Sequence, residues 1–152
     1  MDRKPKITML VGLPRSGKST WVNSNKEDAL VVSSDWIRGN ILGETYGYSE
    51  SANAIVWTIM DSAVRIALGQ GRDVVLDSAN LAKETRSYYV AIGRKYGAHV
   101  KMVVFDTPFE VCLERNQSNG KKLPDSALFH MNLSTEWPYP EECDEIEVVK
   151  CE

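Results

Sequence analysis

The clearest chemical signal in the sequence is a run of small, polar and basic residues, Gly12-Leu13-Pro14-Arg15-Ser16-Gly17-Lys18-Ser19-Thr20. It fits the pattern G-x-x-x-x-G-K-[ST] of a phosphate-binding loop. Glycines let such a loop turn tightly and approach a phosphate without a Cβ atom in the way, and successive backbone N–H groups then point into one anion-binding concavity. An apolar strand expected over 7–11 and a helix expected to continue through 21–23 supply a context that a chance Gly/Ser-rich turn would lack. The sequence therefore predicts a nucleotide-binding loop.

Three side chains at the end of this loop have distinct predicted roles. The Lys18 ammonium is placed to reach the β- and γ-phosphates of a nucleotide, and the Ser19 hydroxyl is placed to bind Mg²⁺. Thr20 is expected to contact the α-phosphate. ATP and Mg²⁺ are therefore the expected cofactors.

An acidic and a basic residue, Asp35 and Arg38, follow the next apolar run. That run, residues 29–34, is typical of a buried strand, and strands of an open α/β sheet end at the ligand-binding edge, beside the phosphate loop. Arg38 comes three residues after Asp35, so a helical turn would put both on one side. Two interpretations of Asp35 stay open: it caps a helix over 36–40, or its carboxylate accepts a proton during catalysis.

A third apolar run, residues 73–77, ends at Asp77. An Asp at the tip of such a strand, near a phosphate loop, is typical of a second partner of the metal, often through water. A turn Asp before a helix is the alternative. The helix expected over 82–96 carries Arg86 in its first turns, where it would lie near the site.

The segment after the fourth strand and its helix is polar and basic. Residues 116–124 contain a glycine and two lysines. We expect residues 116–134 to form a mobile lid that expels water and adds positive charge over the phosphates, with a solvated surface loop as the alternative. Arg115, at the end of the preceding helix, is the expected direct contact to the nucleotide.

Apolar runs alternate with helical segments along the whole chain, and strands are expected over 7–11, 29–34, 73–77, 98–106 and 144–149. Such alternation predicts an α/β fold with a five-stranded parallel sheet, right-handed crossovers and flanking helices. The longest helix is expected over 50–68, with Trp57 and Met60 as packing residues. Its buried face is expected to consist of Ile55, Ile59, Ala63, Ile66 and Ala67.

Length and composition bound the class of protein. The chain has 152 residues, 43% of them hydrophobic and 26% charged, which is typical of one globular domain over 1–152. A net charge of −3 argues against a protein that coats nucleic acid, so any nucleic-acid contact is expected at a local basic site. The absence of an apolar run of about 18 residues and of a signal-peptide core predicts a cytoplasmic protein. Three cysteines without CxxC spacing argue against a disulfide framework or a zinc site.

Taken together, these residues resemble the kinase domain of bacteriophage-type polynucleotide 5′-kinases and the wider group of small P-loop kinases that includes zeta-toxin-like kinases. The resemblance covers nearly the whole chain. It rests on 12–20, Ser34-Asp35-Trp36-Ile37-Arg38, Asp77…Asn80-Leu81…Arg86, Phe105-Asp106-Thr107-Pro108, Arg115-Asn116, Leu123-Pro124 and 139–146.

The resemblance implies a P-loop kinase fold and transfer of the ATP γ-phosphate to a 5′-hydroxyl of DNA or RNA. It implies that Asp35 is the general base and that Arg38 binds the adjacent phosphate of the acceptor strand. Lys18 and Arg115 would carry transition-state charge. The acceptor side would also include Asp77, Asn80 and Arg86.

Two departures from the family pattern fall on the donor side. The family usually has a second lid Arg four residues after the first, where this sequence has Asn119. Lys121 or Lys122 would then act as a point charge without the fork of Arg, and Lys122 joins the predicted nucleotide-binding set. Ala79 stands where the family usually has Thr before Asn80.

Three functions are compatible with these residues. The pair Asp35 and Arg38 favours a polynucleotide 5′-kinase. The modest acidic charge favours a kinase of a small acceptor, such as a nucleoside, a nucleotide sugar or an antibiotic, because counterion release on nucleic acid needs a basic surface. An ATP-binding module that switches a partner needs no base, so Asp35 argues against it.

Overall fold

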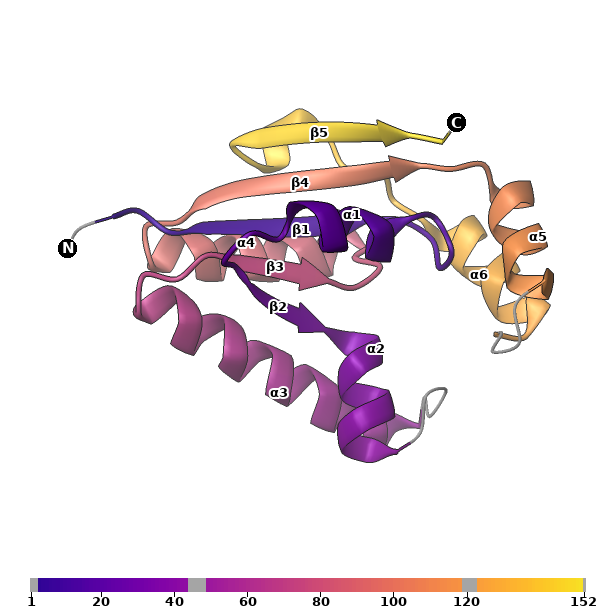
Figure 1. The fold of residues 1–152 in the computed structure, drawn as a ribbon, viewed down its shortest axis with the longest axis horizontal. Coiled ribbons are helices and arrows are strands. Elements are labelled where there is room, and N and C mark those ends of the chain that lie inside the picture. The colour runs from indigo at the N-terminus through magenta and orange to yellow at the C-terminus, as the bar shows by residue number, and fades with distance from the viewer. Residues whose placement is uncertain (1–2, 44–48, 119–122, 152) are drawn as a thin grey trace.

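A parallel β-sheet forms the centre of the structure, a computed structural model that describes residues 3–43, 49–118 and 123–151 (Figure 1). The strands in these ranges are β1 (Lys6–Val11), β2 (Leu30–Ser33), β3 (Val74–Asp77), β4 (His99–Asp106) and β5 (Glu145–Lys150). They lie in the order β2-β3-β1-β4-β5, and every neighbouring pair is parallel. The predicted α/β fold with a five-stranded parallel sheet is confirmed.

Helices cover both faces of this sheet. Over the same ranges they are α1 (Lys18–Asn25), α2 (Ser34–Ile37), the π-helix η1 (Arg38–Leu42), α3 (Glu50–Gly69), α4 (Lys83–Lys95), α5 (Phe109–Ser118), α6 (Asp125–Ser134) and the 3-10 helix η2 (Pro140–Glu142). α3 and α4 pack on one face against Ile7 and Met9 of β1, whereas α1 packs on the other face against Leu10. Successive side chains of a strand point to opposite faces, which explains this division. In the described parts of the chain, no helix combines the length and the apolar character needed to cross a membrane.

The carboxyl ends of β1, β2 and β3 meet at one edge of the sheet, on the right in Figure 1. The pairing register sets Ser33 of β2 beside Asp77 of β3. Gly12 N, just after β1, donates a hydrogen bond of 3.0 Å to Ala79 O, just after β3. The segments that follow these strands are therefore fixed to one another, as expected at the ligand-binding edge of a parallel sheet.

The buried face of α3 differs from the prediction. Ile55 and Ile66 were expected in the core but are 44% and 61% exposed; Ile59 and Ala63 are partly buried, and Ala67 is buried as expected. The core side is formed instead by a stripe at four-residue spacing, Ala52, Val56, Met60, Val64 and Leu68. α3 carries apolar residues on more than one side, so periodicity alone does not select the side that the sheet covers.

We predict that Met60→Ala lowers the free energy of unfolding by about 2–5 kcal/mol, because Met60 is fully buried and its truncation leaves a cavity. Ile66→Ala, on the same helix, is the matched control and should change that free energy by no more than about 0.5 kcal/mol. Urea unfolding of both variants measures the difference. A larger loss in Ile66→Ala than in Met60→Ala would show that α3 buries the other side.

Candidate active site

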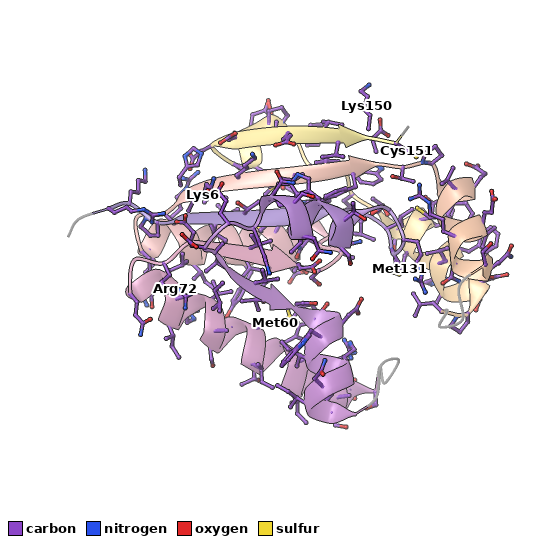
Figure 2. The ribbon with its side chains drawn as sticks, in the orientation of Figure 1. Lys6, Met60, Arg72, Met131, Lys150 and Cys151 are labelled. Carbon is purple, nitrogen blue, oxygen red and sulfur yellow. The ribbon has the colours of Figure 1, made fainter. Side chains whose placement is uncertain are left out.

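A cleft of about 1590 Å³ opens at this edge of the sheet. One wall comes from α2 and α3, and the other comes from α5, α6 and the end of β5. Met131 of α6 and Cys151 after β5, labelled in Figure 2, lie on the second wall. The structure brings most of the predicted site residues together on this cleft: Pro14, Arg15, Ser16, Gly17, Lys18, Ser19, Thr20, Asp35, Arg38, Asp77, Asn80 and Arg115.

Backbone conformation explains the glycines of the phosphate loop. Gly17 has a φ of 109°, a left-handed conformation that glycine adopts without strain. At Gly12, a Cβ atom would lie 2.6 Å from Ser16 Oγ and 3.0 Å from Phe105 Cβ. No larger residue fits at Gly12 unless the loop moves, so the tight turn of the motif depends on this position.

The loop presents groups that suit an anion. α1 begins at Lys18, so its first N–H groups and the positive end of its dipole face the cleft. Ser16 Oγ is buried, and within the described chain it makes no hydrogen bond. Buried hydroxyls normally have a partner, so this orphaned group fits a site that receives a ligand oxygen. Leu13 fixes the loop from behind, because it is buried with Cys112 of α5 and Leu128 of α6.

The Lys18 ammonium folds back on its own loop. Nζ donates hydrogen bonds to Gly12 O at 2.8 Å and to Leu13 O at 2.7 Å. Burial lowers the pKa of Lys18 to about 8, although the Asp77 and Asp35 carboxylates act to raise it. A partly buried cation whose charge is only partly compensated favours the arrival of further negative charge.

Two carboxylates share this part of the cleft with Lys18. Burial raises the pKa of Asp77, the Lys18 ammonium lowers it, and the Asp35 carboxylate raises it again. Asp35 does not cap α2, because Ser33 Oγ accepts the capping hydrogen bond from Trp36 N at 3.2 Å. The N-cap interpretation of Asp35 is therefore wrong, and its exposed carboxylate faces the cleft beside Lys18.

Two arginines lie on opposite walls of the cleft. Arg38, where α2 continues into η1, is buried, and its Nη2 donates to Asn53 Oδ1 of α3 at 2.7 Å. Arg115 of α5 donates from Nη1 to Arg15 O at 3.0 Å, which brings its guanidinium against the phosphate loop. One cation thus lies on the Asp35 side and the other on the loop side.

Asn80 and Arg86 form a support beneath the cleft. Asn80 adopts a φ of 49°, and its Nδ2 donates to Leu10 O at 2.7 Å, next to the phosphate loop. Arg86 is fully buried and does not line the cleft: Nε donates to Glu142 Oε1 at 2.9 Å, and Nη1 donates to Asn80 O at 2.9 Å. The structure therefore does not bring Arg86 to the site where the sequence placed it.

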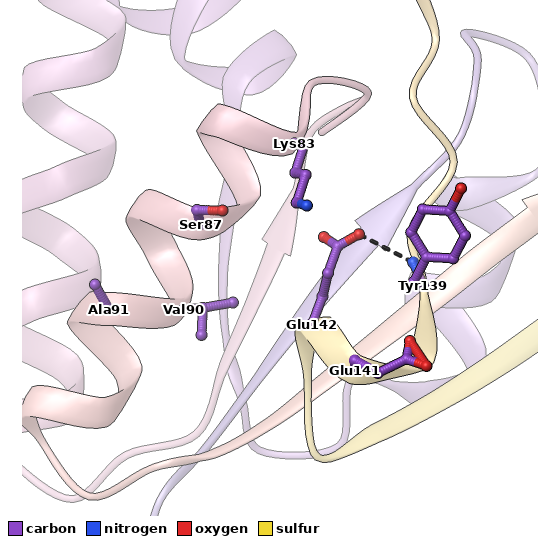
Figure 3. A pocket seen from close by; sticks show the side chains of 7 residues that line it. All are labelled: Lys83, Ser87, Val90, Ala91, Tyr139, Glu141 and Glu142. Carbon is purple, nitrogen blue, oxygen red and sulfur yellow. Dashed lines mark hydrogen bonds between the residues drawn. The ribbon is translucent and has the colours of Figure 1, made fainter.

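Glu142, the partner of Arg86, also borders a second and smaller pocket of about 470 Å³ between α4 and η2 (Figure 3). Burial acts to raise the pKa of Glu142. The hydrogen bonds from Arg86 and from Tyr139 N outweigh that effect and hold the pKa below its usual value. The pocket shares no lining residue with the cleft. At this pocket Glu142 holds η2 against α4 through its ion pair with Arg86.

The cleft residues fit a Mg²⁺ ion that arrives with a nucleotide. Among residues 3–43, 49–118 and 123–151, no group of three or more His, Cys, Asp or Glu side chains could hold a metal by itself. Mg²⁺ in phosphate sites usually takes only one or two protein ligands, with phosphates and water completing its shell. Ser19 and Asp77, an exposed hydroxyl and a carboxylate on the cleft, match that need.

The predicted lid lies only in part within the described residues. α5 and α6 are linked by Asn116, whose Nδ2 donates to Leu123 O at 2.8 Å and whose Oδ1 accepts from Leu123 N at 3.1 Å. Lys122 and Asn119 fall outside the described residues. Closure of 116–134 over the nucleotide therefore stays a prediction.

The cleft residues that sequence reasoning missed include Asn53 and Trp57 of α3. Trp57 was interpreted as a packing residue, which is wrong, because it is 41% exposed. One signal in the sequence was available: Asn53 lies about one helical turn before Trp57. The other apolar residues of the helix were sufficient to form its buried side without these two.

Comparison with known proteins agrees with this fold. Residues 7–136 match the family AAA_33, described as an AAA domain. A chain of the Pnkp1/Rnl/Hen1 RNA repair complex is 24% identical, with a TM-score of 0.76 over 88% of this chain and 45% of that chain. This chain therefore spans less than half of that relative.

Two further structures align over most of both chains. Chaetomium thermophilum Kti12 in complex with ADP-AlF3 is 17% identical, with a TM-score of 0.73 over 95% of this chain and 88% of that chain. Mycobacterium tuberculosis APS kinase CysC in complex with AMPPNP and APS is 20% identical, with a TM-score of 0.64 over 96% and 89%. These likenesses confirm the P-loop kinase fold, and because the relatives have different activities, the acceptor has to be argued from the site.

We predict that nucleotide binding depends on pH through Lys18. Phosphates stabilise the charged amine, so the pKa of Lys18 rises on binding from its value of about 8 in the free protein. Below pH 8 the amine is already protonated and contributes no pH dependence. Above pH 8 binding must take up a proton, and the association constant should fall roughly tenfold per pH unit.

Isothermal titration with a non-hydrolysable ATP analogue at pH 7 to 9.5 measures this dependence. Titrations in two buffers of different ionisation enthalpy count the protons taken up. Equal affinity at pH 7 and pH 9.5, without proton uptake, would contradict the burial of Lys18.

Proposed function

The chain belongs to the AAA domain family that matches residues 7–136, and from this membership and the cleft we propose that it is an ATP-dependent kinase of polynucleotide 5′-hydroxyl groups. The observation that carries the proposal is the joint position of Lys18, Asp35 and Arg38 on one cleft. Lys18 belongs to a donor phosphate site. Asp35 and Arg38 are suited to an acceptor that carries both a hydroxyl and a phosphate.

On the donor side, the N–H groups of the loop and of the first turn of α1 bind the phosphates of ATP. Lys18 leaves the loop carbonyls that it now contacts and binds the β- and γ-phosphates, while Thr20 contacts the α-phosphate. Mg²⁺, held by the Ser19 hydroxyl and through water by Asp77, would neutralise charge on the β- and γ-phosphates.

On the acceptor side, Asp35 accepts the proton of the attacking 5′-hydroxyl as the oxygen bonds to the γ-phosphorus. Arg38, fixed by its hydrogen bond to Asn53, binds the next phosphate of the strand and orients the hydroxyl. As the bond to the β-phosphate oxygen breaks, Lys18 and Arg115 stabilise the charge on the transferring group from the loop side.

A kinase of a small acceptor is the second candidate. A structural relative is an APS kinase, and the net charge of −3 gives no broad basic surface for a long nucleic acid. Arg38 on the cleft supports the first candidate over an acceptor without phosphate, such as a simple sugar or an antibiotic, because a guanidinium suits phosphate binding.

We predict that Asp35→Asn lowers kcat for phosphate transfer about 10²- to 10⁴-fold, because the amide cannot take the proton, with ATP affinity retained. Lys18→Ala should abolish transfer with the fold intact. Asp28→Asn, an exposed carboxylate away from the cleft, is the matched control. Transfer by Asp35→Asn at the wild-type rate would remove Asp35 as the base.

A second experiment tests the acceptor. Wild-type protein with radiolabelled ATP and Mg²⁺ is offered a 5′-hydroxyl oligonucleotide in DNA and RNA form, beside nucleosides, nucleotide sugars and aminoglycosides. Label on an oligonucleotide is the expected result. Label only on a small molecule would favour the second candidate, and tight ATP binding without any labelled acceptor would favour a nucleotide-controlled switch.

A further inference from the structure

Trp57 places an exposed aromatic ring on the wall of the cleft. It is 41% exposed, whereas its neighbour on α3, Val56, and the residue one turn later, Met60, are fully buried in the core. The buried side of α3 is therefore formed by residues other than Trp57. An aromatic surface left open in a cleft loses the free energy that its burial would provide, and aromatic side chains commonly line ligand pockets.

The same wall carries a fixed cation. Asn53 lies four residues before Trp57, so the two side chains share one face of α3 at a separation of about one turn. Asn53 Oδ1 accepts a hydrogen bond of 2.7 Å from Arg38 Nη2. Arg38, Asn53 and Trp57 all line the cleft together with Asp35. A guanidinium, an aromatic ring and a carboxylate thus line the same cleft, on its acceptor side.

We propose that Trp57 stacks on the nucleobase of the acceptor's terminal nucleotide, so that the acceptor site selects a nucleotide by its base as well as by its phosphate. This inference rests on the proposed function and narrows its substrate class. Base stacking does not distinguish sequence, because every base has a π-face. The site therefore accepts any terminal base and discriminates against acceptors that lack one.

The test compares two 5′-hydroxyl oligonucleotides that differ only at the terminal nucleotide, which is either intact or abasic. With the intact acceptor, Trp57→Ala should lower kcat/KM roughly 5- to 150-fold, the range for loss of one base stack. With the abasic acceptor, wild type and Trp57→Ala should be equal. Trp137→Ala is the matched control, since Trp137 is 45% exposed and does not line the cleft.

Equal losses with both acceptors would overturn the proposal, because Trp57 would then support the fold or Arg38 rather than a base. Unchanged ATP affinity in Trp57→Ala confirms that the donor site is intact.

If wild type phosphorylates no oligonucleotide, the proposed function fails, and stacking is tested by binding alone. With the donor site saturated by a non-hydrolysable ATP analogue, adenosine 3′-monophosphate and ribose 3-phosphate are titrated into wild type and Trp57→Ala. Tighter binding of the monophosphate that carries the base, lost in Trp57→Ala, supports the stack. Equal binding of both probes to wild type overturns it.

Discussion

The burial of one positive charge is the interaction on which the site depends. The Lys18 ammonium donates hydrogen bonds to two loop carbonyls, and burial lowers its pKa even with Asp77 and Asp35 near it. A cation in such a place interacts with phosphate more strongly than it would in water. The parallel sheet makes this possible, because it brings the segments after β1, β2 and β3 to one edge.

The far part of the chain supports this arrangement from below. Glu142 binds Arg86 across 56 residues of sequence, Arg86 binds the Asn80 carbonyl, and Asn80 binds the end of β1. Removing one partner of such a buried pair leaves an uncompensated charge. The left-handed backbone of Asn80 is thus held both by Arg86 and by the end of β1. The segment around η2 does not line the cleft, but through Arg86 it stabilises Asn80, which does.

The sequence was sufficient for the fold and for the edge of the sheet at which the cleft opens. The alternation of apolar runs with helical segments determined the parallel sheet, and the motif at 12–20 determined its ligand-binding edge. The partner of Arg86 could not be predicted, since no local pattern selects Glu142 from the acidic residues of the chain. The exposed side of α3, with Trp57, could not be predicted either, because several of its sides are apolar and only the packed sheet selects one.

The most direct test is a crystal structure with a non-hydrolysable ATP analogue, Mg²⁺ and a 5′-hydroxyl oligonucleotide bound together. The distance to measure joins a carboxylate oxygen of Asp35 to the terminal 5′-oxygen. A hydrogen bond of roughly 2.6–3.2 Å, with that oxygen facing the γ-phosphate beside Lys18, is the predicted result. A 5′-oxygen that lies out of reach of Asp35, or that contacts Asp77 instead, would contradict the account.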